Sequence, residues 1–365
     1  MQKDKELDKK KVLLVNLSRI WGGGEKWFYT VAVGLRKRGY QAELMVYPDS
    51  KLNQLVREAD IPYSAYAVRA LSLLNPFKLF QIWEELKRQA PQVVILNSSH
   101  ELKVVGLVAK WAGVPHIIFR RGVSYAIKQN KVNCYYIRQI VTGFIANSQA
   151  TYQAFLQAFP SIAAKPHLSM NNGIDVEAWR SQVKRTPKRY DFITTARLSP
   201  EKGLERAIQA VSLLVQKGLA VSYIIWGEGD QQAELKTLIE SHDLSEYVSL
   251  AGFSDQIPQK LVEGKIFLFT PHFGEGTSIS LIEAMALELP CIVMDTPAMS
   301  EVVLDGETGY VVPDGNITQL ADRMETLLKE EYLRLNMGKK ASQRAEDHFT
   351  LSQILDSLDK WLESL

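Results

Sequence analysis

Short runs of β-branched and other apolar residues alternate with amphipathic segments along almost all of this 365-residue chain. The runs have the length of strands and the amphipathic segments have the apolar spacing of helices, so the pattern predicts parallel βαβ units. The pattern is interrupted over residues 165–187, around the turn Asn172-Gly173, and then starts again. We therefore expect an α/β protein with two Rossmann-like, doubly wound domains, residues 1–178 and 179–346.

Each expected domain contains several runs of strand length. In the first domain these are Lys11–Asn16, Gln41–Tyr47, Pro91–Leu96, Val114–Phe119 and Gly143–Ala146. In the second they are Tyr190–Ala196, Val221–Trp226, Val248–Ala251, Ile266–Thr270 and Pro290–Asp295. Residues Val302–Pro313 are expected to form a hairpin-like extension with turns at Gly306 and Gly309. Consecutive doubly wound domains place ligands at the carboxyl ends of their strands, facing one another across a cleft.

The net charge of +2 conceals an asymmetry along the chain. Residues 1–178 contain 24 Lys and Arg against 13 Asp and Glu, whereas residues 179–365 contain 19 against 28. Ordinary solubilising charge is one interpretation. The other is that the first half meets an anionic membrane surface, a lipid-phosphate acceptor or an acidic glycan. The amphipathic segment Pro76–Gln89 is interpreted as a core-facing helix, with a membrane-surface helix as the alternative.

The number of cysteines and the lengths of the apolar segments indicate the compartment in which the protein works. Cys134 and Cys291 are the only cysteines, and neither has a neighbour at metal-ligand spacing, so a disulfide scaffold and a zinc site are disfavoured. Such low usage fits a reducing compartment. No segment approaches the roughly 18 apolar residues that span a bilayer, and the charged N-terminus lacks the apolar region of a signal peptide. We expect a cytoplasmic protein, with peripheral contact at the inner face of the plasma membrane as a further possibility.

A glycine run, Gly22-Gly23-Gly24, links the first expected strand to a helix that starts near Glu25. Glycines let backbone N–H groups approach a phosphate, and the helix N-terminus adds partial positive charge. The run is not GxGxxG, so the dinucleotide fingerprint is absent. A tight turn without a ligand is the structural alternative.

A second loop, ARLSPEKG over residues 196–203, follows the first strand of the second domain. Its two cations, Arg197 and Lys202, flank the entry to a helix and have the spacing to clamp a pyrophosphate. A departing nucleoside diphosphate gains negative charge as the glycosidic bond breaks, so fixed cations stabilise the transition state more than the ground state. A capped helix start with solvated charges is the alternative.

The third motif, FGEGTSISLIEAMA over residues 273–286, places Glu275 in a loop and Glu283 on the following helix. Glu275 is suited to accept hydrogen bonds from sugar hydroxyls, beside the backbone N–H groups of residues 276–278 at the helix N-terminus. Glu283 is suited to hold a ribose diol, as acidic residues do in other nucleotide folds. The alternative is that both carboxylates only cap and solvate the helix.

Together these motifs closely resemble the retaining glycosyltransferases of family 4, also called glycosyl transferases group 1, which have the GT-B fold. The resemblance runs from about residue 11 to the C-terminus and is densest in the second domain. It is carried by the E-x7-E pair, the RLSPEKG and GGGE loops, Asn172–Asp175 (NGID), Gly227–Asp230 (GEGD), Val248–Phe253 (VSLAGF) and Asp305–Gly309 (DGETG).

The resemblance implies a metal-independent enzyme without a cofactor, whose donor substrate is a UDP- or GDP-sugar. It assigns Arg197, Lys202 and Glu275 to catalysis, with the two cations on the diphosphate and the carboxylate on the transferred sugar. The donor-binding residues that it implies are Gly23, Gly24, Gly252, Phe253, Gly276, Thr277, Ser278 and Glu283. It also implies that a closing helix, about residues 347–365, packs back onto the first domain. No nucleic-acid partner is expected.

One departure from the family concerns the acceptor side. Many relatives place histidines where this sequence has Arg121 and Asn97, although His100 is close to the second position. Arginine cannot act as a general base. Front-face attack does not require one, because the departing phosphate oxygen can take the acceptor proton. An arginine pair here is suited to an anionic acceptor group, or to an interdomain salt bridge. Asn97, His100, Arg121 and Asn147 are the candidate acceptor or sugar contacts.

The sequence thus predicts a retaining glycosyltransferase that acts on a lipid-linked or cell-envelope glycan, including exopolysaccharide. Two other functions remain open. One is a GT-B nucleotide-sugar epimerase, and the other is a catalytically silent subunit that binds sugar nucleotides. The intact Arg197, Lys202, Glu275 and Glu283 argue against loss of activity.

Overall fold

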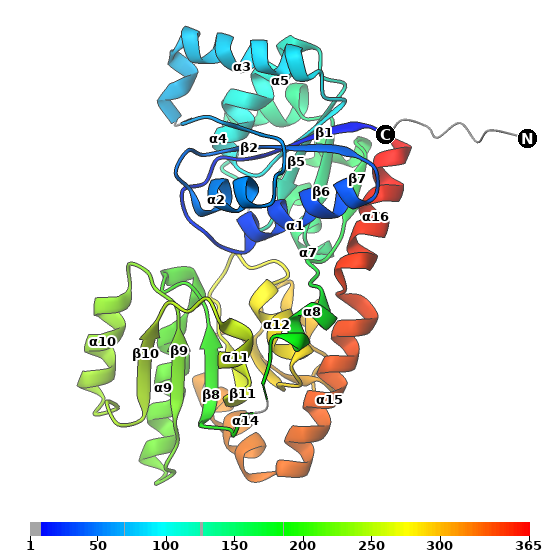
Figure 1. Cartoon of the computed structure of the whole chain (residues 1–365). Coiled ribbons are helices and arrows are strands. Elements are labelled where there is room, and N and C mark those ends of the chain that lie inside the picture. Colours follow the sequence, from blue (N-terminus) through cyan, green and yellow to red (C-terminus); the bar gives the residue numbers. More distant parts are fainter. Residues whose placement is uncertain (1–8, 69, 125–126, 185) are drawn as a thin grey trace, which may run out of the picture. The chain divides into compact units, whose positions relative to one another are not determined.

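The computed structural model describes residues 9–68, 70–124, 127–184 and 186–365, and it divides into two compact units (Figure 1). Of these described residues, 9–122, 127–170 and 355–365 belong to unit 1, and 123–124 and 171–354 belong to unit 2. The expected boundary after residue 178 therefore differs from the observed division. Residues 171–178 belong with unit 2 because α8 (Val176–Ser181), which begins within them, packs on a helix of that unit, α12 (Ile279–Ala286).

In its described residues, unit 1 has a seven-stranded parallel sheet of order β3-β2-β1-β4-β5-β6-β7. The strands are β1 Lys11–Asn16, β2 Gln41–Val46, β3 Tyr63–Ala65, β4 Val93–Leu96, β5 His116–Arg121, β6 Gly143–Ala146 and β7 His167–Ser169. The edge strands β3 and β7 were not expected, because three residues are too few to show a strand pattern in sequence.

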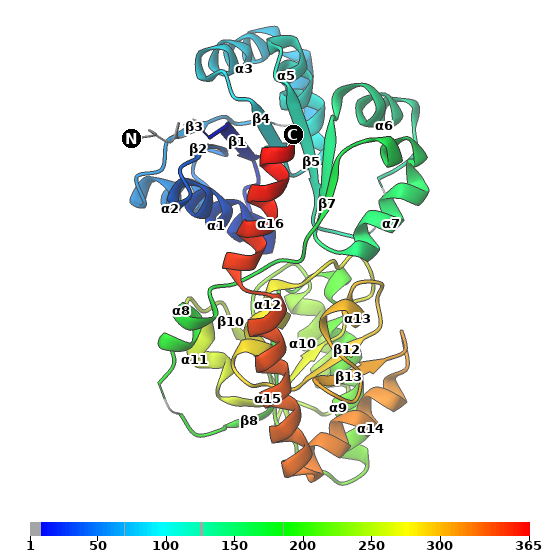
Figure 2. The same cartoon turned by 90° about the vertical axis from the view of Figure 1, so that its right-hand side faces the viewer.

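Helices cover both faces of the unit 1 sheet (Figure 2). Those with regular geometry are α1 Gly23–Lys37, α2 Lys51–Glu58, α3 Pro76–Gln89, α4 Ser99–Glu101, α5 Leu107–Ala112, α6 Lys131–Tyr135, α7 Gln149–Ala158 and the end of α16 (Leu351–Ser364). Short 3-10 turns are η1 Ala70–Leu74 and η4 Pro160–Ala164, and π turns are η2 Leu102–Gly106 and η3 Tyr136–Ile140. Right-handed crossovers put α1 on one face and the helices after β4 on the other, because the chain reverses direction across the sheet.

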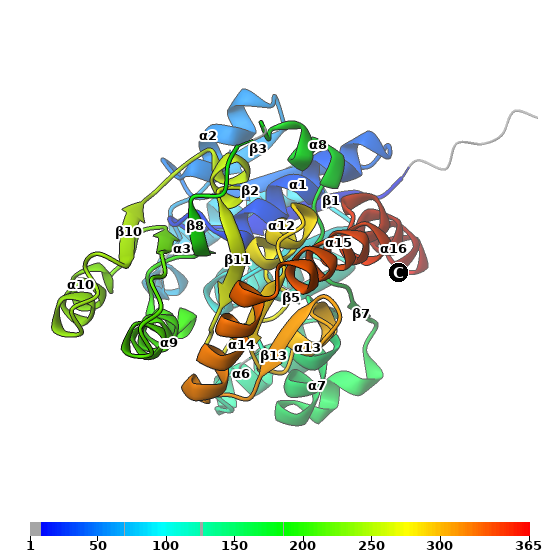
Figure 3. The ribbon, with the colours of Figure 1, turned by 90° about the horizontal axis from the view of Figure 1, so that it is seen from below.

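The described part of unit 2 has a six-stranded parallel sheet of order β10-β9-β8-β11-β12-β13. The strands are β8 Tyr190–Thr195, β9 Tyr223–Trp226, β10 Val248–Gly252, β11 Gly264–Phe269, β12 Cys291–Met294 and β13 Gly309–Val312. The helices besides α8 and α12 are η5 Pro200–Lys202, α9 Leu204–Gln216, α10 Gln232–Ser241, α11 Ile257–Leu261, α13 Met299–Val302, α14 Ile317–Lys329 and α15 Glu331–His348. Helices α9 and α14 pack together over one apolar core (Figure 3).

The expectation of a hairpin-like extension at residues 302–313 is wrong. Residues Gly309–Val312 form β13, which pairs in parallel with β12 and extends the sheet by one strand. The turn before it is closed by a bond from the Gly306 amide to the Gly309 carbonyl. A hairpin and a short crossover share the same turn residues, so the local sequence did not separate them.

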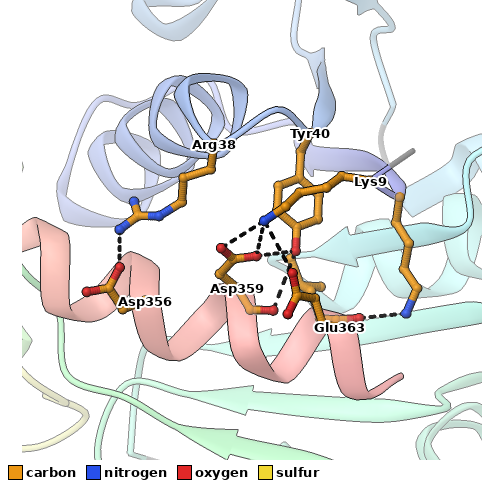
Figure 4. A network of polar contacts seen from close by, with 8 residues as sticks. Lys9, Arg38, Tyr40, Asp356, Asp359 and Glu363 are labelled. Atoms are coloured by element: carbon orange, nitrogen blue, oxygen red, sulfur yellow. Dashed lines mark hydrogen bonds and ion pairs between the residues drawn. The ribbon is translucent and has the colours of Figure 1, made fainter. Parts of the chain in front are cut away.

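The last helix belongs to unit 1 from Leu355 onward, which is later than the residue 347 that the sequence suggested. A polar network holds it against the start of the chain and the end of α1 (Figure 4). Asp359 accepts hydrogen bonds from Lys9 Nζ at 2.8 Å and from the Tyr40 hydroxyl at 2.5 Å. Arg38 pairs with Asp356. Burial raises the pKa of Asp359, but the bonds from Lys9 and Tyr40 outweigh it and leave this pKa below its ordinary value.

Candidate active site

The strand order of unit 2 locates a ligand site before any side chain is considered. The chain runs outward from β8 through β9 to β10, and then from β11 through β12 to β13 on the other side. The loops after β8 and β11 therefore diverge at a topological switch point, where doubly wound sheets bind ligands. The loop after β8 carries Arg197 and Lys202, and the loop after β11 carries Glu275.

These two loops meet through a charged pair. Lys202 Nζ lies 2.5 Å from Glu275 Oε1, and both side chains are largely buried. The ammonium also lies 5.6 Å from the centre of the Phe269 ring at the end of β11. The structure thus brings together two of the three residues expected to act in catalysis.

Backbone contacts fix the position of this pair. Gly203 has a φ of +58°, and a Cβ there would lie 2.1 Å from the carbonyl oxygen of Thr270. The Thr270 hydroxyl donates to the Gly203 carbonyl at 2.9 Å, and the amide of His272 donates to the Glu201 carbonyl at 3.0 Å. Glycine is required at this position because any side chain would push the two loops apart.

Arg197 lies on the same loop and is half exposed. Its guanidinium contacts Glu201 Oε1 at 2.5 Å and the Ser199 hydroxyl at 3.2 Å. Burial raises the pKa of Glu201, but the bonds from Ser199 and Arg197 outweigh it and leave this pKa below its ordinary value. Arg197 is therefore held by its own loop, with a partner that stays ionised.

The far end of the Glu275 loop is anchored by residues that the sequence analysis did not assign to the site. The Thr277 hydroxyl donates to Asn171 Oδ1 at 2.7 Å, and the Asn172 side-chain amide donates to the Thr277 carbonyl. Asn172 was named only as part of a turn and of the Asn172–Asp175 segment that carries the family resemblance. The missing information was the contact across 106 residues between Asn171 and Thr277, which no local pattern reports.

Residues 276–278 lead directly into α12, as the motif suggested. Ser278 is the N-cap residue, and its hydroxyl lies 3.0 Å from that of Ser280. Glu283 is buried within α12, with 5% of its surface exposed, and its backbone carbonyl accepts a bond from Trp179 Nε1. A buried carboxylate requires partners, because its desolvation is costly.

Two of the expected donor-binding residues, Gly252 and Phe253, lie at the end of β10 and directly after it. Gly252 has a φ of +76°, and its carbonyl accepts a bond from the Gly227 amide at 2.8 Å. The Phe253 side chain that follows is mostly exposed. On the neighbouring strand, Trp226 lies under Lys260, with Nζ at 5.0 Å from the indole centre. This end of the sheet therefore presents aromatic surfaces suited to a planar base.

A further pair, not expected from the sequence, braces the Glu275 loop. Nε2 of His272 lies within hydrogen-bond distance of Oε1 of Glu205, in the first turn of α9. Next to it, Arg206 donates to the Pro271 carbonyl at 3.0 Å and pairs with Asp314 at 2.7 Å. His272 thus supports the loop that carries Glu275.

Unit 1 has its own switch point between β1 and β4. The glycine loop after β1 enters α1, so Gly23 and Gly24 lie in the first turn of this helix. The buried Asn16 donates to Glu25 Oε1 at 3.3 Å. A Cβ on Gly24 would lie 3.5 Å from Nδ2 of Asn97, at the end of β4. Two of the predicted contact loops are therefore adjacent within this unit.

Of the two neighbouring arginines, Arg120 contacts Asn97 and Trp27 beside the glycine loop. It is 2% exposed, lies 4.1 Å from the centre of the Trp27 ring, and donates to Asn97 Oδ1 at 3.2 Å. Burial lowers the pKa of Arg120 to about 9, while Glu25 acts in the opposite direction. Arg121 instead lies near Phe155 of α7, at 6.0 Å. The two arginines thus face different surroundings, because consecutive residues in a strand point to opposite faces.

Glu101 joins the loops after β1 and β4. Its carboxylate accepts bonds from the backbone amides of Leu17, Asn97 and Ser98 at 2.7–2.8 Å. Burial raises the pKa of Glu101 to about 7, although these bonds lower it. The sequence did contain a signal for this residue, because Ser98 and Glu101 form a capping box. The neighbouring His100 is exposed on α4.

Asn147, the last candidate acceptor contact, is buried at the end of β6. Its side-chain amide donates to the Gly122 carbonyl at 3.0 Å, its backbone amide donates to the Arg121 carbonyl at 3.1 Å, and its Oδ1 accepts from the Thr151 hydroxyl. These bonds tie the ends of β5 and β6 together, so Asn147 shapes this edge of the sheet.

Two doubly wound units, each with a polar loop cluster at its switch point, define the GT-B fold. The model for glycosyl transferases group 1 matches residues 175–344, and that for glycosyltransferase family 4 matches residues 21–178. Since the two matches together cover residues 21–344, the chain belongs to glycosyltransferase family 4.

Among curated relatives, the chain is 31% identical over 169 residues to the poly(ribitol-phosphate) alpha-N-acetylglucosaminyltransferase of Staphylococcus aureus, covering 46% of this chain and 33% of the relative. It is 28% identical to the alpha-D-kanosaminyltransferase of Streptomyces kanamyceticus, covering 50% of this chain and 49% of the relative. The chain thus spans about half the length, or less, of these relatives.

Solved structures show the same fold at low identity. Anabaena HepE in complex with UDP and glucose has a TM-score of 0.84 and 20% identity, over 98% of this chain and 100% of that one. A glycosyltransferase from Rickettsia africae has a TM-score of 0.82 and 19% identity, over 98% of both chains.

Proposed function

We propose that this protein is a retaining glycosyltransferase that moves a sugar from a nucleotide-sugar donor to a cell-envelope or exopolysaccharide glycan, including a lipid-linked one. The observation that carries the proposal is the contact between Lys202 and Glu275 at the switch point of unit 2, with Arg197 on the same loop. Family membership and the named activities of the relatives support the reaction class.

The chemistry follows from these side chains. Lys202 and Arg197 supply fixed positive charge where the leaving diphosphate develops negative charge, which lowers the barrier to cleavage of the glycosidic bond. Glu275 accepts hydrogen bonds from hydroxyls of the transferred sugar, while it keeps Lys202 in place. The leaving phosphate oxygen takes the acceptor proton on the same face of the sugar, so the anomeric configuration is retained.

The positive charges of Lys202 and Arg197 also bear on whether the reaction needs a metal ion. Two cations beside the diphosphate replace the charge that a divalent ion supplies in other transferases, so we propose metal-independent transfer without a cofactor. The donor is a UDP- or GDP-sugar. The UDP bound in the HepE complexes supports a UDP-sugar. We place the protein in the cytoplasm, where its two unpaired cysteines, Cys134 and Cys291, stay reduced. In the described residues, no helix is both long and apolar enough to cross a membrane.

The test is product analysis. The purified protein is incubated with a panel of UDP- and GDP-sugars and a glycan acceptor in excess chelator, and the anomeric configuration of the new linkage is read by NMR. We expect an α-linked product from an α-linked donor, at a rate that the chelator does not change. A β-linked product would exclude retention, and a strict need for a divalent ion would exclude the metal-free mechanism.

The alternative functions predict different results when the protein is incubated with the same panel of nucleotide sugars. A nucleotide-sugar epimerase inverts C2 of the free donor without any acceptor. A silent subunit raises its thermal stability with a nucleotide sugar but releases no nucleoside diphosphate. Either result would replace the proposed reaction.

A further inference from the structure

We propose that unit 1 binds anionic lipid bilayers through a docking surface formed by Leu74, Phe77 and Phe80. These side chains are 78%, 81% and 55% exposed, at the end of η1 and on the first turns of α3. Single exposed apolar residues are ordinary, but three large ones on adjacent turns form a patch that burial would stabilise. This surface is distinct from the loops at either switch point.

Helix α3 has one buried face and one exposed face. Ile82 and Leu86 are buried in the unit 1 core, which fulfils the expectation of a core-facing helix. Phe77 and Phe80 lie on the opposite, exposed stripe, three residues apart and therefore on one side of the helix. Phe80 stacks on Trp83, with ring centres 5.8 Å apart. The helix is thus apolar on both faces near its start, and the outer face has no core to contact.

The charges around this surface select the occupant. The C-terminal half of α3 exposes Glu84, Lys87 and Arg88, and the half-buried Glu85 is bonded to Arg88 at 2.6 Å, so α3 as a whole carries three cations and two acids. Helix α5 packs against α3 and ends in the exposed Lys110 and Trp111. Apolar side chains beside cations match the interface of an anionic bilayer, where aromatic rings enter the headgroup region and lysines meet phosphates.

Other exposed elements of unit 1 have a similar composition. Helix α6 exposes Val132 and Tyr135, and η3, which packs against α5, carries the exposed Arg138. Lys131 at the start of α6 is also exposed. A protein partner would be expected to offer acidic groups in a fixed pattern, whereas a bilayer requires only apolar side chains and net positive charge. The excess of cations over acids in residues 1–178 favours the bilayer.

The experiment uses the full chain and sucrose-loaded vesicles in a sedimentation assay. We expect binding to vesicles of phosphatidylcholine mixed with phosphatidylglycerol, and little binding to phosphatidylcholine alone. The double variant Phe77→Ser/Phe80→Ser should lower binding about tenfold or more, since both phenyl groups would no longer leave water on binding. Lys87→Glu/Arg88→Glu should lower it in proportion to the anionic lipid, and added salt should reduce the difference.

A matched control is available in unit 2. Tyr332 and Leu335 on α15 are 86% and 55% exposed, so Tyr332→Ser/Leu335→Ser removes comparable apolar surface elsewhere and should leave binding unchanged. Wild-type protein that does not sediment with phosphatidylglycerol vesicles would overturn the proposal and leave a protein as the occupant. Equal loss in both double variants would also overturn it. Vesicle binding is measured without sugar transfer, so its failure would leave the proposed reaction untouched.

Discussion

Lys202 Nζ and Glu275 Oε1 lie 2.5 Å apart, although 73 residues separate them in the chain. Each belongs to a different loop at the switch point, and each side chain is largely buried. Such a pair is costly to break, because removal of one partner leaves an uncompensated charge. The same contact therefore supports the loop and preorganises the charges that we propose act on the donor.

Replacement of either partner should abolish most of the transfer activity. For Lys202→Ala and Glu275→Ala we expect kcat to fall about 10²–10³-fold, as is usual when one electrostatic partner of a transition state is lost. Initial rates with saturating donor measure this effect. Lys217→Ala is the control, because it breaks exposed pairs with Asp322 and Glu325 far from the loops. Near-normal turnover in both site variants would refute the assignment.

The orientation of Asn97 leads to a second prediction. Its Oδ1 accepts from Arg120, which directs its NH2 group toward Gly24. Asn97→Asp keeps an acceptor for Arg120 but replaces the donor with a second carboxylate oxygen. We expect KM for the substrate that contacts the glycine loop to rise about tenfold, since a hydrogen bond to a charged group contributes roughly 1.5–3 kcal/mol. Unchanged KM for both substrates, with an unchanged urea midpoint, would remove Asn97 from the site.

Gly203 and Gly218 test whether the close approach of the two loops has an energetic cost. Both glycines have positive φ, +58° and +80°, but a Cβ on Gly218 would meet nothing within 4 Å. Gly218→Ala should therefore lose only about 1–2 kcal/mol of unfolding free energy, the usual cost of a left-handed alanine. Gly203→Ala adds the clash with Thr270 and should lose clearly more, together with activity. Equal losses in urea unfolding would contradict the geometry.

Glu101 predicts a pH dependence of stability. Its folded pKa of about 7 lies above the unfolded value of 4.5, so the folded state holds its proton more tightly. This contribution is complete below the unfolded pKa and is lost as the pH rises through about 7. Urea unfolding of the wild type should therefore show a fall in free energy from about pH 5 to about pH 7. Glu101→Gln, which cannot ionise, should show a smaller fall in unfolding free energy over this pH range. If the wild type and the variant had parallel curves of unfolding free energy against pH, Glu101 would not be the cause of the fall.

The buried strands could be predicted well, and the short edge strands could not. The runs Lys11–Asn16 and Gly143–Ala146 match β1 and β6 at both ends, because buried parallel strands are continuous apolar runs. The strands β3 and β7 have only three residues each, so pairing with a neighbour rather than composition creates them. Strand β13 was mistaken for half of a hairpin because a hairpin and a short crossover share the same turn residues.

The site divides in a similar way. Arg197, Lys202 and Glu275 were named from loops that follow strands and precede helices, and their assignment to catalysis came from the resemblance to the family. Arg120 was recognised only as a member of an arginine pair with Arg121, and Asn171 and the contact of His272 with Glu205 were not predicted, because each makes its contact with a residue distant in the chain. Glu101 is the exception, because its capping box is a local signal.

The sequence by itself determined the two sheets, the order of most strands along the chain and the loops that carry charge, because these depend on periodicity and on residues a few positions apart. Only the tertiary structure decided which charges meet, which of Arg120 and Arg121 is enclosed, and where the chain passes from one unit to the other. Those outcomes depend on packing between segments far apart in sequence, where sterics and desolvation select one arrangement among many that the local pattern allows.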